Sequence, residues 1–450
     1  MNLKYHRIGL DATEYQRDKN GNVLHVPIFS PAKRFESVGF STIYVANANM
    51  DLKNEIHKGD LVYFKANNNR GVNNLGRTME SMGSCEDVAE VFCYYALKAL
   101  NEAIKDDAVL IPTPYNFAEF LNEDFRNIIS KQTYHLVGSS RFYGCISPNV
   151  IDENGVILHG NHLLKLVFED KDSLKTINNN IYSYDSALKI FAREMAKQKT
   201  EMYIHPICSR YLANTLFFDY FMANSDRHCK NVNFQKIILP NGENIILPLA
   251  ILDNGGALAL QSRNCEELYT QQTQYLEKNN ERFSPTMGFE KYNPFDCQYD
   301  FNVGEKCFVN PEMSQLYEKS SYVEQMVLLA SQNKVLFNDL KNIYSNLSFD
   351  LALDQMRDNN KFPEDYLPNF RKVNKAVLKF KKEEISKAMA KFLGIEFNVE
   401  LFDNNENYYL DKFELIVEKN ALNIHIANNE EINEFNQVLD SLKINFGKNA

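Results

Sequence analysis

The sequence contains no apolar run long enough to cross a membrane. Its longest apolar runs are strand-length, as in Ile245–Leu252, which Pro248 interrupts, whereas a membrane-spanning helix needs about 20 apolar residues. The first residues of the chain also lack the apolar core of a secretory signal. We therefore expect a soluble cytoplasmic protein without a membrane span. Export as an effector by a signal-independent route stays open.

The chain also lacks an excess of positive charge and any cluster of cysteines. It has 49 Lys plus Arg against 59 Asp plus Glu, a formal net charge of −10. An acidic chain is a poor generic binder of nucleic acid or anionic membrane, so no direct nucleic-acid partner is predicted. The eight cysteines are scattered without a C-x-x-C pair, which argues against a clustered zinc site and indicates reduced thiols.

The composition is that of an ordinary globular protein. Of the 450 residues, 44% are hydrophobic and 24% are charged, which excludes wholesale disorder and collagen-like repetition. Changes in pattern predict an N-terminal extension at 1–35, a strand-rich part at 36–170, a mostly helical part at 171–395 and a C-terminal extension at 396–450. The predicted fold class is α+β.

Paired strands are expected early in the strand-rich part. Residues 41–48 and 61–66 are rich in β-branched and aromatic residues and flank a turn at 57–60. The polar, Asn- and Gly-rich stretch at 67–83 predicts a loop. More strands are expected over 132–168, with a turn at 153–155. Upstream, Asn20-Gly21 indicates a short hairpin.

A helix is predicted after the polar loop. Ser84 to Asp87 has the S-x-x-D form of a helix N-cap. The apolar residues that follow recur at helical spacing, namely Val88, Phe92, Tyr95 and Ala99.

The second half of the chain reads as helices around one hairpin. Asn241-Gly242 separates two β-rich runs at 231–239 and 244–252, and Asn-Gly between such runs is a strong hairpin signal because both residues tolerate positive φ. Helices are expected over 183–199, 211–222 and 310–395. The extension is expected to hold strands at 413–418 and 421–427 and a helix at 430–442.

The residues that flank this hairpin point to chemistry. Asp226 and Asn231 stand five apart before it, and Asp253 follows it in Asp-Asn-Gly-Gly. Asp226 can accept or orient the proton of an attacking hydroxyl, while Asn231 and Asp253 offer hard oxygen ligands for Mg²⁺. D-x-x-x-x-N alone is a weak motif. Its order relative to the helix, the hairpin and the second Asp is specific, and it predicts phosphoryl transfer from a metal-bound nucleotide.

A cation for the phosphates is expected on the strand at 61–66. Lys65 lies near the end of that strand, and the capped helix follows about twenty residues later, the arrangement of a strand lysine fixed by a helix carboxylate. Glu90 is the expected partner, with Glu86 and Glu80 as rivals.

The loop that covers the phosphates is harder to assign, because neither G-x-G-x-x-G nor G-x-x-x-x-G-K-[ST] is present. The segment 37–42, with Gly39 and Ser41, precedes the first strand and is the preferred candidate by position. The alternative is 71–76, which Arg70 and Arg77 flank.

Together, the Lys65 strand, the Glu-bearing helix, Asp226-Arg227-His228-x-x-Asn231 and Asp253-Asn-Gly-Gly resemble the HipA-like serine/threonine kinases of the phosphoinositide-3-kinase-like group. The resemblance implies a bilobal protein-kinase-like fold with a strand-rich N-lobe and a helical C-lobe. It also implies the cofactors ATP and Mg²⁺, a catalytic Asp226, and autophosphorylation at Ser37 or Ser41. By the same resemblance His228 is a second candidate catalytic residue, which would stabilise charge on the transferred phosphoryl as in phosphoinositide-type kinases; a histidine that only orders the loop is the alternative. The chain departs from the usual Asp-Phe-Gly at 253–255, and 396–450 matches no part of the family.

The expected activity is that of an ATP- and Mg²⁺-dependent protein serine/threonine kinase with a protein substrate of unknown identity. A lipid or small-molecule kinase of the same fold is an alternative, as is a nucleotide-binding pseudokinase scaffold. The sequence does not indicate an oligomeric state.

Overall fold

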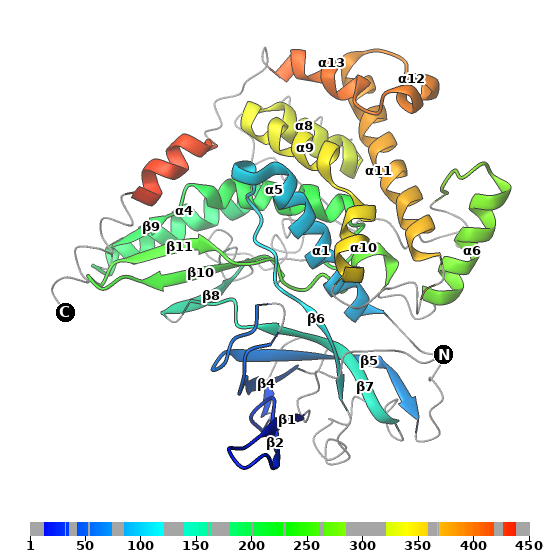
Figure 1. Cartoon of the computed structure of the whole chain (residues 1–450). Coiled ribbons are helices and arrows are strands. Elements are labelled where there is room, and N and C mark those ends of the chain that lie inside the picture. The colour runs from blue at the N-terminus through cyan, green and yellow to red at the C-terminus, as the bar shows by residue number, and fades with distance from the viewer. Residues whose placement is uncertain are drawn as a thin grey trace.

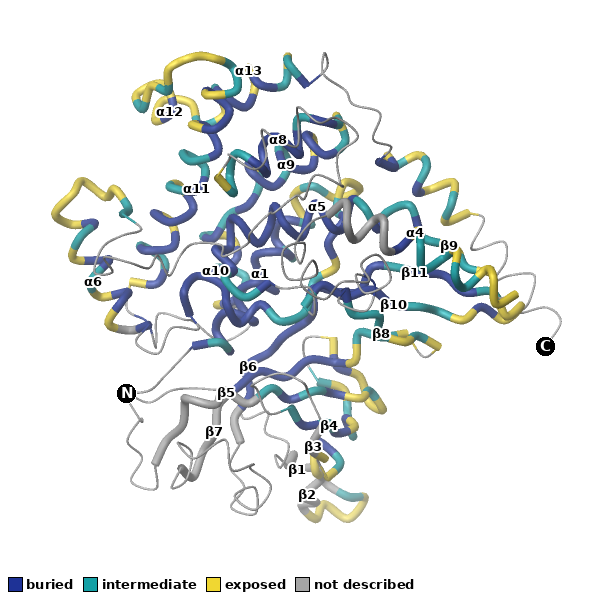
Figure 2. Tube along the Cα trace, turned by 180° about the vertical axis from the view of Figure 1, so that it is seen from behind, coloured by how far each residue is buried: buried dark blue, intermediate teal, exposed yellow. Residues whose placement is uncertain are grey.

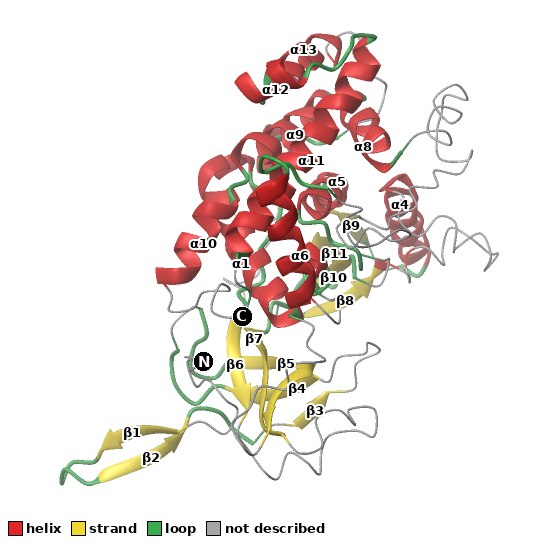
Figure 3. Cartoon of the chain, turned by 90° about the vertical axis from the view of Figure 1, so that its right-hand side faces the viewer, coloured by secondary structure: helices red, strands yellow, loops and turns green. Residues whose placement is uncertain are grey.

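The structure is a computed structural model that describes the chain over 13–31, 33–35, 43–52, 55–73, 85–120, 139–152, 154–160, 163, 181–199, 201–227, 231–260, 265–284, 321–358, 367, 369–417 and 426–437. Everything below concerns these residues. The fold is α+β, as predicted. A five-stranded sheet lies at one end of the molecule and most helices at the other, with a smaller sheet between them (Figure 3).

The five-stranded sheet has the order β3-β4-β5-β7-β6 and is antiparallel throughout. Its strands are β3 (Lys33–Phe35), β4 (Ile43–Asn47), β5 (Leu61–Asn73), β6 (Asn116–Phe120) and β7 (Ser139–Pro148). One face buries a small core that includes Tyr44, Phe64 and Ile146. Alternate residues of a strand point to opposite faces, so Phe64 fills this core while Lys65 points the other way, toward the helices. A separate hairpin, β1 (Thr13–Arg17) and β2 (Val23–Pro27), forms around the Asn20-Gly21 turn, as predicted.

The predicted strands at 41–48 and 61–66 pair in the expected antiparallel way, with Ile43 opposite Lys65. The loop predicted at 67–83 is wrong in its first part, because β5 continues to Asn73 and pairs with β7. A register shift between Ala66 and Gly71 lets the polar stretch stay in the sheet. The alternative phosphate segment therefore begins inside a strand, and its residues after Asn73 lie outside the described part.

Helix α1 (Glu86–Ile104) is the predicted helix and lies between the sheet and the other helices (Figure 1). Its N-cap is Cys85, whose side chain makes no capping hydrogen bond, and Ser84 lies outside the described residues. Most of the helix is buried, so packing rather than a cap stabilises it. Phe92, for example, makes edge-on contacts with Phe349 and Phe370 at 5.3 and 5.2 Å between ring centroids. A short 3₁₀ turn, η1 (Lys105–Asp107), follows α1.

The smaller sheet contains the predicted hairpin. Strands β10 (Asn233–Ile238) and β11 (Asn244–Pro248) are joined by two others in the order β8-β10-β11-β9. Strand β8 (Gly155–His159), foreseen within 132–168, thus pairs with the hairpin and not with β7. Strand β9 (Met202–Ile204) pairs in parallel with β11.

The hairpin turn differs from the predicted form in its backbone. Of Asn241 and Gly242, only Gly242 has a positive φ, at 85°. The Gly242 N–H donates to Leu239 O, and the Leu239 N–H donates to Glu243 O. This is a three-residue loop that ends in a left-handed residue, a common hairpin connection that needs glycine at its last position.

Helices build the rest of the molecule, and their buried faces form one large core (Figure 2). The predicted helices at 183–199, 211–222 and 310–395 are confirmed within the described residues. They are α4 (Ile181–Lys197), α5 (Ile207–Phe221), α8 (Tyr322–Ser331), α9 (Lys334–Asn346), α10 (Phe349–Asp358) and α11 (Phe370–Leu393). The turn η4 (Ala257–Ala259) and helix α6 (Cys265–Lys278) follow the hairpin. No helix in these ranges is both long and apolar enough to cross a membrane.

The start of the C-terminal extension belongs to this core. Helices α12 (Val399–Asn404) and α13 (Tyr408–Val417) bury Phe402, Tyr409 and Phe413 against it. The strand predicted at 413–418 is therefore wrong up to Val417. The strand predicted at 421–427 lies outside the described residues up to 425, and 426–428 are not strand. The helix predicted at 430–442 is confirmed over its described part, because 429–437 are helical.

Candidate active site

Lys65 lies between two carboxylates that come from distant parts of the chain. Its Nζ is 2.8 Å from Glu90 Oε1 on α1 and 2.6 Å from Asp253 Oδ1 after β11. The second Glu90 oxygen accepts a hydrogen bond from the Asn254 N–H at 2.8 Å. Glu90 is wholly buried, and both of its oxygens are thereby satisfied, as a buried carboxylate requires. Of the carboxylates named from the sequence, Glu90 is the one that pairs with Lys65; Glu80 lies outside the described residues.

Burial and charge act on Lys65 in opposite directions. Burial by itself lowers the pKa of the ammonium group, but the carboxylates of Asp253, Glu90 and Glu86 together raise that pKa well above its ordinary value. Lys65 is therefore a fixed positive charge at neutral pH. Tyr115 lies against the same group, and burial raises the pKa of its phenol well above the ordinary range.

The backbone after β11 directs Asp253 toward Lys65. Asp253 has a φ of 60°, in the left-handed region that Asp tolerates better than most residues. The preceding chain is held by residues 111–113. The Ile251 N–H donates to Ile111 O at 2.9 Å, and the Thr113 hydroxyl donates to Ile251 O at 2.6 Å. These backbone contacts fix the position of Asp253, while its side chain remains 42% exposed to solvent.

Arg227 fastens the loop before the hairpin to the segment after it. Its guanidinium is paired with Asp219 of α5, with Nε to Oδ2 at 2.8 Å and Nη2 to Oδ1 at 3.2 Å. Its Nη1 donates both to Asn231 O at 2.9 Å and to Leu252 O at 2.5 Å. Because one nitrogen holds both carbonyls, the backbones beside the two predicted metal ligands are brought close together. Nη2 also donates to the Asn254 side chain at 2.7 Å.

Asp226 and Asn231 lie five positions apart in the sequence and are joined by a hydrogen bond. The Asp226 N–H donates to Asn224 Oδ1 at 3.1 Å, a local turn that fixes the backbone at Asp226. The Asn231 side-chain nitrogen donates to Asp226 O at 2.9 Å. The side-chain oxygen of Asn231 therefore points away from that carbonyl. Both residues are partly exposed.

Two glycines join the halves of the cluster. A Cβ on Gly256 would come within 2.8 Å of the Asp226 Cβ and 2.9 Å of Asn224 Oδ1. A Cβ on Gly255 would lie 3.6 Å from the Lys65 Nζ and 3.4 Å from the Glu86 side chain. The Asp253-Asn-Gly-Gly segment therefore passes Lys65 on one side and Asp226 on the other.

The donor set fits a hard divalent cation. Asp226, Asn231 and Asp253 offer oxygen atoms only, and the carboxylates around Lys65 outnumber its single positive charge. Polyphosphate alone would be repelled by such a cluster, whereas a cation between carboxylate and phosphate removes the conflict. No three His, Cys, Asp or Glu side chains of the described ranges converge as a metal cage. Mg²⁺ does not need one, because phosphates and water complete its coordination.

No family model matches the chain, and no curated protein matches it. Among solved structures, the chain is similar to the crystal structure of a Helicobacter pylori proinflammatory kinase, CtkA. The TM-score is 0.46 and the sequence identity 13%, over 82% of this chain and 97% of the other. A likeness at this level does not assign the chain to a family.

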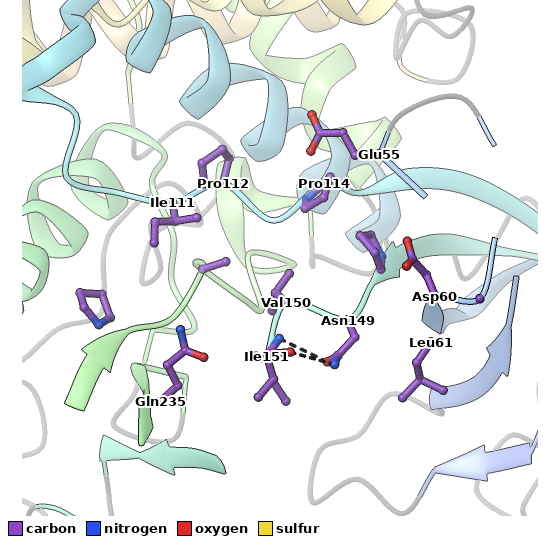
Figure 4. A pocket seen from close by; sticks show the side chains of 14 residues that line it. Glu55, Asp60, Leu61, Ile111, Pro112, Pro114, Asn149, Val150, Ile151 and Gln235 are labelled. Carbon is purple, nitrogen blue, oxygen red and sulfur yellow. Dashed lines mark hydrogen bonds between the residues drawn. The ribbon is translucent and has the colours of Figure 1, made fainter. Parts of the chain in front are cut away.

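A separate cavity of about 560 Å³ lies on another side of residues 111–115. Figure 4 shows Ile111, Pro112 and Pro114 along one wall and Asn149 to Ile151 along another. Its lining mixes apolar side chains with the polar groups of Glu55, Asp60, Asn149 and Gln235. None of the predicted site residues that the structure describes lines it. Thr113 and Tyr115, the alternate residues of the same segment, are buried and contact the Asp253 and Lys65 side instead.

Three of the predicted site residues, His228, Gly39 and Ser41, lie outside the described residues, as does Ser37, so their roles stay predictions. The sequence analysis missed Asp219, Asn254 and the spacing role of Gly256. Asp219 did carry a signal, because it is the one acidic residue in the apolar run at 211–222. A charge in a buried helix needs a partner, and Arg227 is that partner.

Proposed function

We propose that this chain is an ATP- and Mg²⁺-dependent protein serine/threonine kinase of the HipA-like type. The observation that supports it most is the position of Lys65, held by the buried Glu90 of α1 and by Asp253 after β11. In protein kinases a strand lysine must be paired with a helix glutamate, and a nearby Asp must hold the metal, before phosphoryl transfer occurs. Here Lys65 meets Glu90, which lies 25 residues later in the sequence, and Asp253, which lies 188 residues later.

Each side chain has a defined task in this proposal. Lys65 places one positive charge on the phosphates. Asp226 accepts or orients the proton of the attacking hydroxyl. Asn231 and Asp253 would hold Mg²⁺, which supplies neutralisation of phosphate charge when bound. Asp253 contacts Lys65 through one oxygen and is open on one side, so its carboxylate can serve a cation there.

The remaining assignments come from position in the sequence and from the resemblance. Gly39 and Ser41 would contact the phosphates, and His228 would stabilise the transferred phosphoryl group. The acceptor would be a protein hydroxyl, with Ser37 or Ser41 as autophosphorylation sites.

Turnover with labelled ATP tests the proposal. We expect the full chain with Mg²⁺ to label itself or a lysate protein on Ser or Thr. We expect Asp226→Asn to lower the rate by about 10²- to 10⁴-fold, the usual contribution of a general base. Circular dichroism checks that the variant is folded. EDTA is expected to abolish the labelling.

Calorimetry and lipid substrates separate this function from the alternatives. Binding of ATP with no turnover by the wild type would contradict the enzyme and favour a scaffold. Turnover only with added lipid would contradict a protein acceptor. Equal rates for the wild type and Asp226→Asn would remove Asp226 from the mechanism.

A further inference from the structure

Two cysteines from distant parts of the chain are in contact where α1 and α6 begin. Cys85 directly precedes α1, Cys265 begins α6, and their sulfur atoms are 3.1 Å apart. They are 180 residues apart in sequence, and their residues are only 3% and 0% exposed. The proposed chemistry of the Lys65 cluster gives neither thiol a role.

The backbone on both sides keeps these sulfur atoms together. The Cys85 N–H donates to Leu260 O at 2.7 Å, which ties the start of α1 to the chain shortly before Cys265. One turn into α6, the hydroxyl of the buried Tyr269 contacts Leu258 O at 3.1 Å and Asn374 Oδ1 at 2.9 Å. A disulfide has a sulfur–sulfur distance of about 2.05 Å. Closing this pair therefore needs an approach of only about 1 Å between the two sulfur atoms.

We propose that Cys85 and Cys265 are a modification site at which hydrogen peroxide converts the two thiols to a disulfide. One thiol loses its proton, and its sulfur attacks an oxygen of peroxide. The O–O bond breaks, a sulfenic acid forms on that cysteine, and the departing hydroxide takes up the lost proton to form water. The second sulfur then attacks the sulfenic sulfur, the S–S bond forms, the S–O bond breaks, and water leaves. Two thiols and one peroxide give one disulfide and two waters. Peroxide suits the buried pair because a small oxidant needs only a brief opening of a helix end.

The disulfide would fix α1 in the position that the Lys65 pair requires. Glu90 lies five residues after Cys85 on the same helix. In the structure, the two sulfur atoms are in contact while Glu90 holds Lys65, so a covalent bond between them favours this arrangement over any in which α1 moves away. The effect on phosphoryl transfer rests on the proposed kinase function, whereas formation of the disulfide does not.

Peptide mapping by mass spectrometry tests the bond itself. The reduced full chain is treated with hydrogen peroxide, blocked with an alkylating agent and digested without reductant. We expect a crosslinked peptide pair that contains Cys85 and Cys265 and that dithiothreitol separates. The oxidised protein should melt about 3–5 °C higher, because a disulfide that closes a long loop restricts the unfolded chain.

The variants Cys85→Ala and Cys265→Ala should each lose the crosslink and the rise in Tm. Cys93→Ala is the matched control, because Cys93 is buried on the same helix and should leave both unchanged. Two variants on opposite partners keep the test usable if one of them does not fold. Crosslinks that involve only other cysteines, or oxidation of either thiol to sulfinic acid without a crosslink, would overturn the proposal. A crosslink without a higher Tm would overturn its stabilising role. Neither readout needs ATP, so a failure of the kinase function would show separately, in the turnover assay.

Discussion

Lys65 owes its position to three residues from two separate segments of the chain. Glu90 and Asp253 hold its ammonium group, and the Asn254 N–H holds the other oxygen of Glu90. Each of these contacts is local in space and remote in sequence. At the scale of residues, the site therefore depends on a few side chains whose replacement has distinct consequences.

Replacing Glu90 with Gln removes the charge while keeping the shape. If the amide NH₂ of the variant faces Lys65, the bond to the ammonium group is lost; if it faces Asn254, the bond from the Asn254 N–H is lost. A hydrogen bond to a charged group contributes about 1.5–3 kcal/mol. We expect Glu90→Gln to slow ATP-dependent labelling by about 10- to 100-fold in a steady-state assay. Glu86→Gln, one turn earlier on α1, is the control and should stay within about threefold of the wild type. Equal losses in both would mean that the charge of the helix, not the pair, matters.

Gly256 and Gly255 provide a matched pair for steric effects. A methyl group on Gly256 meets Asp226 at 2.8 Å, closer than real contacts allow, whereas one on Gly255 meets Glu86 at 3.4 Å. We expect Gly256→Ala to lower the free energy of unfolding by about 1–3 kcal/mol, the usual cost of overpacking. Gly255→Ala should change it by much less. Urea unfolding of the two variants in parallel measures the difference, and a larger loss at Gly255 would contradict the geometry.

At the scale of elements, one buried ion pair holds α5, the Asp226 loop and the end of β11 together. Arg227 and Asp219 are each 1% exposed, and the guanidinium also holds the carbonyls of Asn231 and Leu252. Removing one partner of such a pair leaves an uncompensated charge in the interior.

We expect Arg227→Ala to destabilise the protein by about 3–5 kcal/mol, read as a lower midpoint in chemical denaturation. Arg193→Ala is the control. Arg193 pairs with Glu194 at the surface and is 67% exposed, and such pairs contribute about 0–1 kcal/mol. A loss at Arg227 no greater than that at Arg193 would show that the loop is held in another way.

The elements also show where sequence patterns succeed and fail. The hairpin at 233–248 was predictable because Asn-Gly between β-rich runs is a local signal. The segment 413–418 was not, since Phe413, Leu415 and Val417 alternate as in a strand. In the structure Phe413 and Val417 are buried and Leu415 is 65% exposed, the spacing of a helix face. Packing against the other helices decided between two periods that a short segment satisfies equally well.

At the scale of the whole molecule, the chain after α13 returns to the start of α5. The helix at 429–437, red in Figure 1, lies beside β9 and α4. The Asn429 oxygen accepts from Arg210, whose guanidinium also pairs with the buried Asp339. Near the other end, Phe435 packs edge-on against His205 at 4.9 Å. These contacts attach the last described helix to residues more than 200 positions earlier.

His205 makes this attachment sensitive to pH. Its Nε2 lies 2.9 Å from the Asn436 side-chain oxygen, and its Nδ1 accepts a hydrogen bond from the Ile207 N–H. An Nδ1 that accepts cannot carry a proton, so this network holds the neutral ring. Burial lowers the pKa of His205, although the bond to Asn436 opposes the shift. The folded protein therefore binds this proton less readily than the unfolded chain does.

The sign of the pH effect follows from this difference. The stability contributed by neutral His205 is present above the unfolded pKa of about 6.5 and is lost as the pH falls through the lower folded pKa. We expect the Tm to fall between pH 7 and pH 5, and His205→Gln to reduce that fall, because Gln can donate to Asn436 but does not titrate. Differential scanning fluorimetry across this range makes the comparison. An identical pH profile in the variant would remove His205 as the cause.

The sequence by itself determined the local features of this protein. Turn chemistry predicts the hairpin, and periodicity predicts the main helices. The types and order of Lys65, Asp226, Asn231 and Asp253, together with the ligand preferences of Mg²⁺, predict the candidate site. These depend on residues that are neighbours along the chain or on residue type alone.

Only the tertiary structure decided which distant residues meet. The choice of Glu90 over Glu86, the partner of Arg227, the contact of Cys85 with Cys265, and the return of 429–437 to α5 are set by packing between elements. A lysine or arginine in a sequence does not name its carboxylate, because burial selects the partner by the desolvation that an unpaired charge would suffer. That selection acts on the folded chain as a whole.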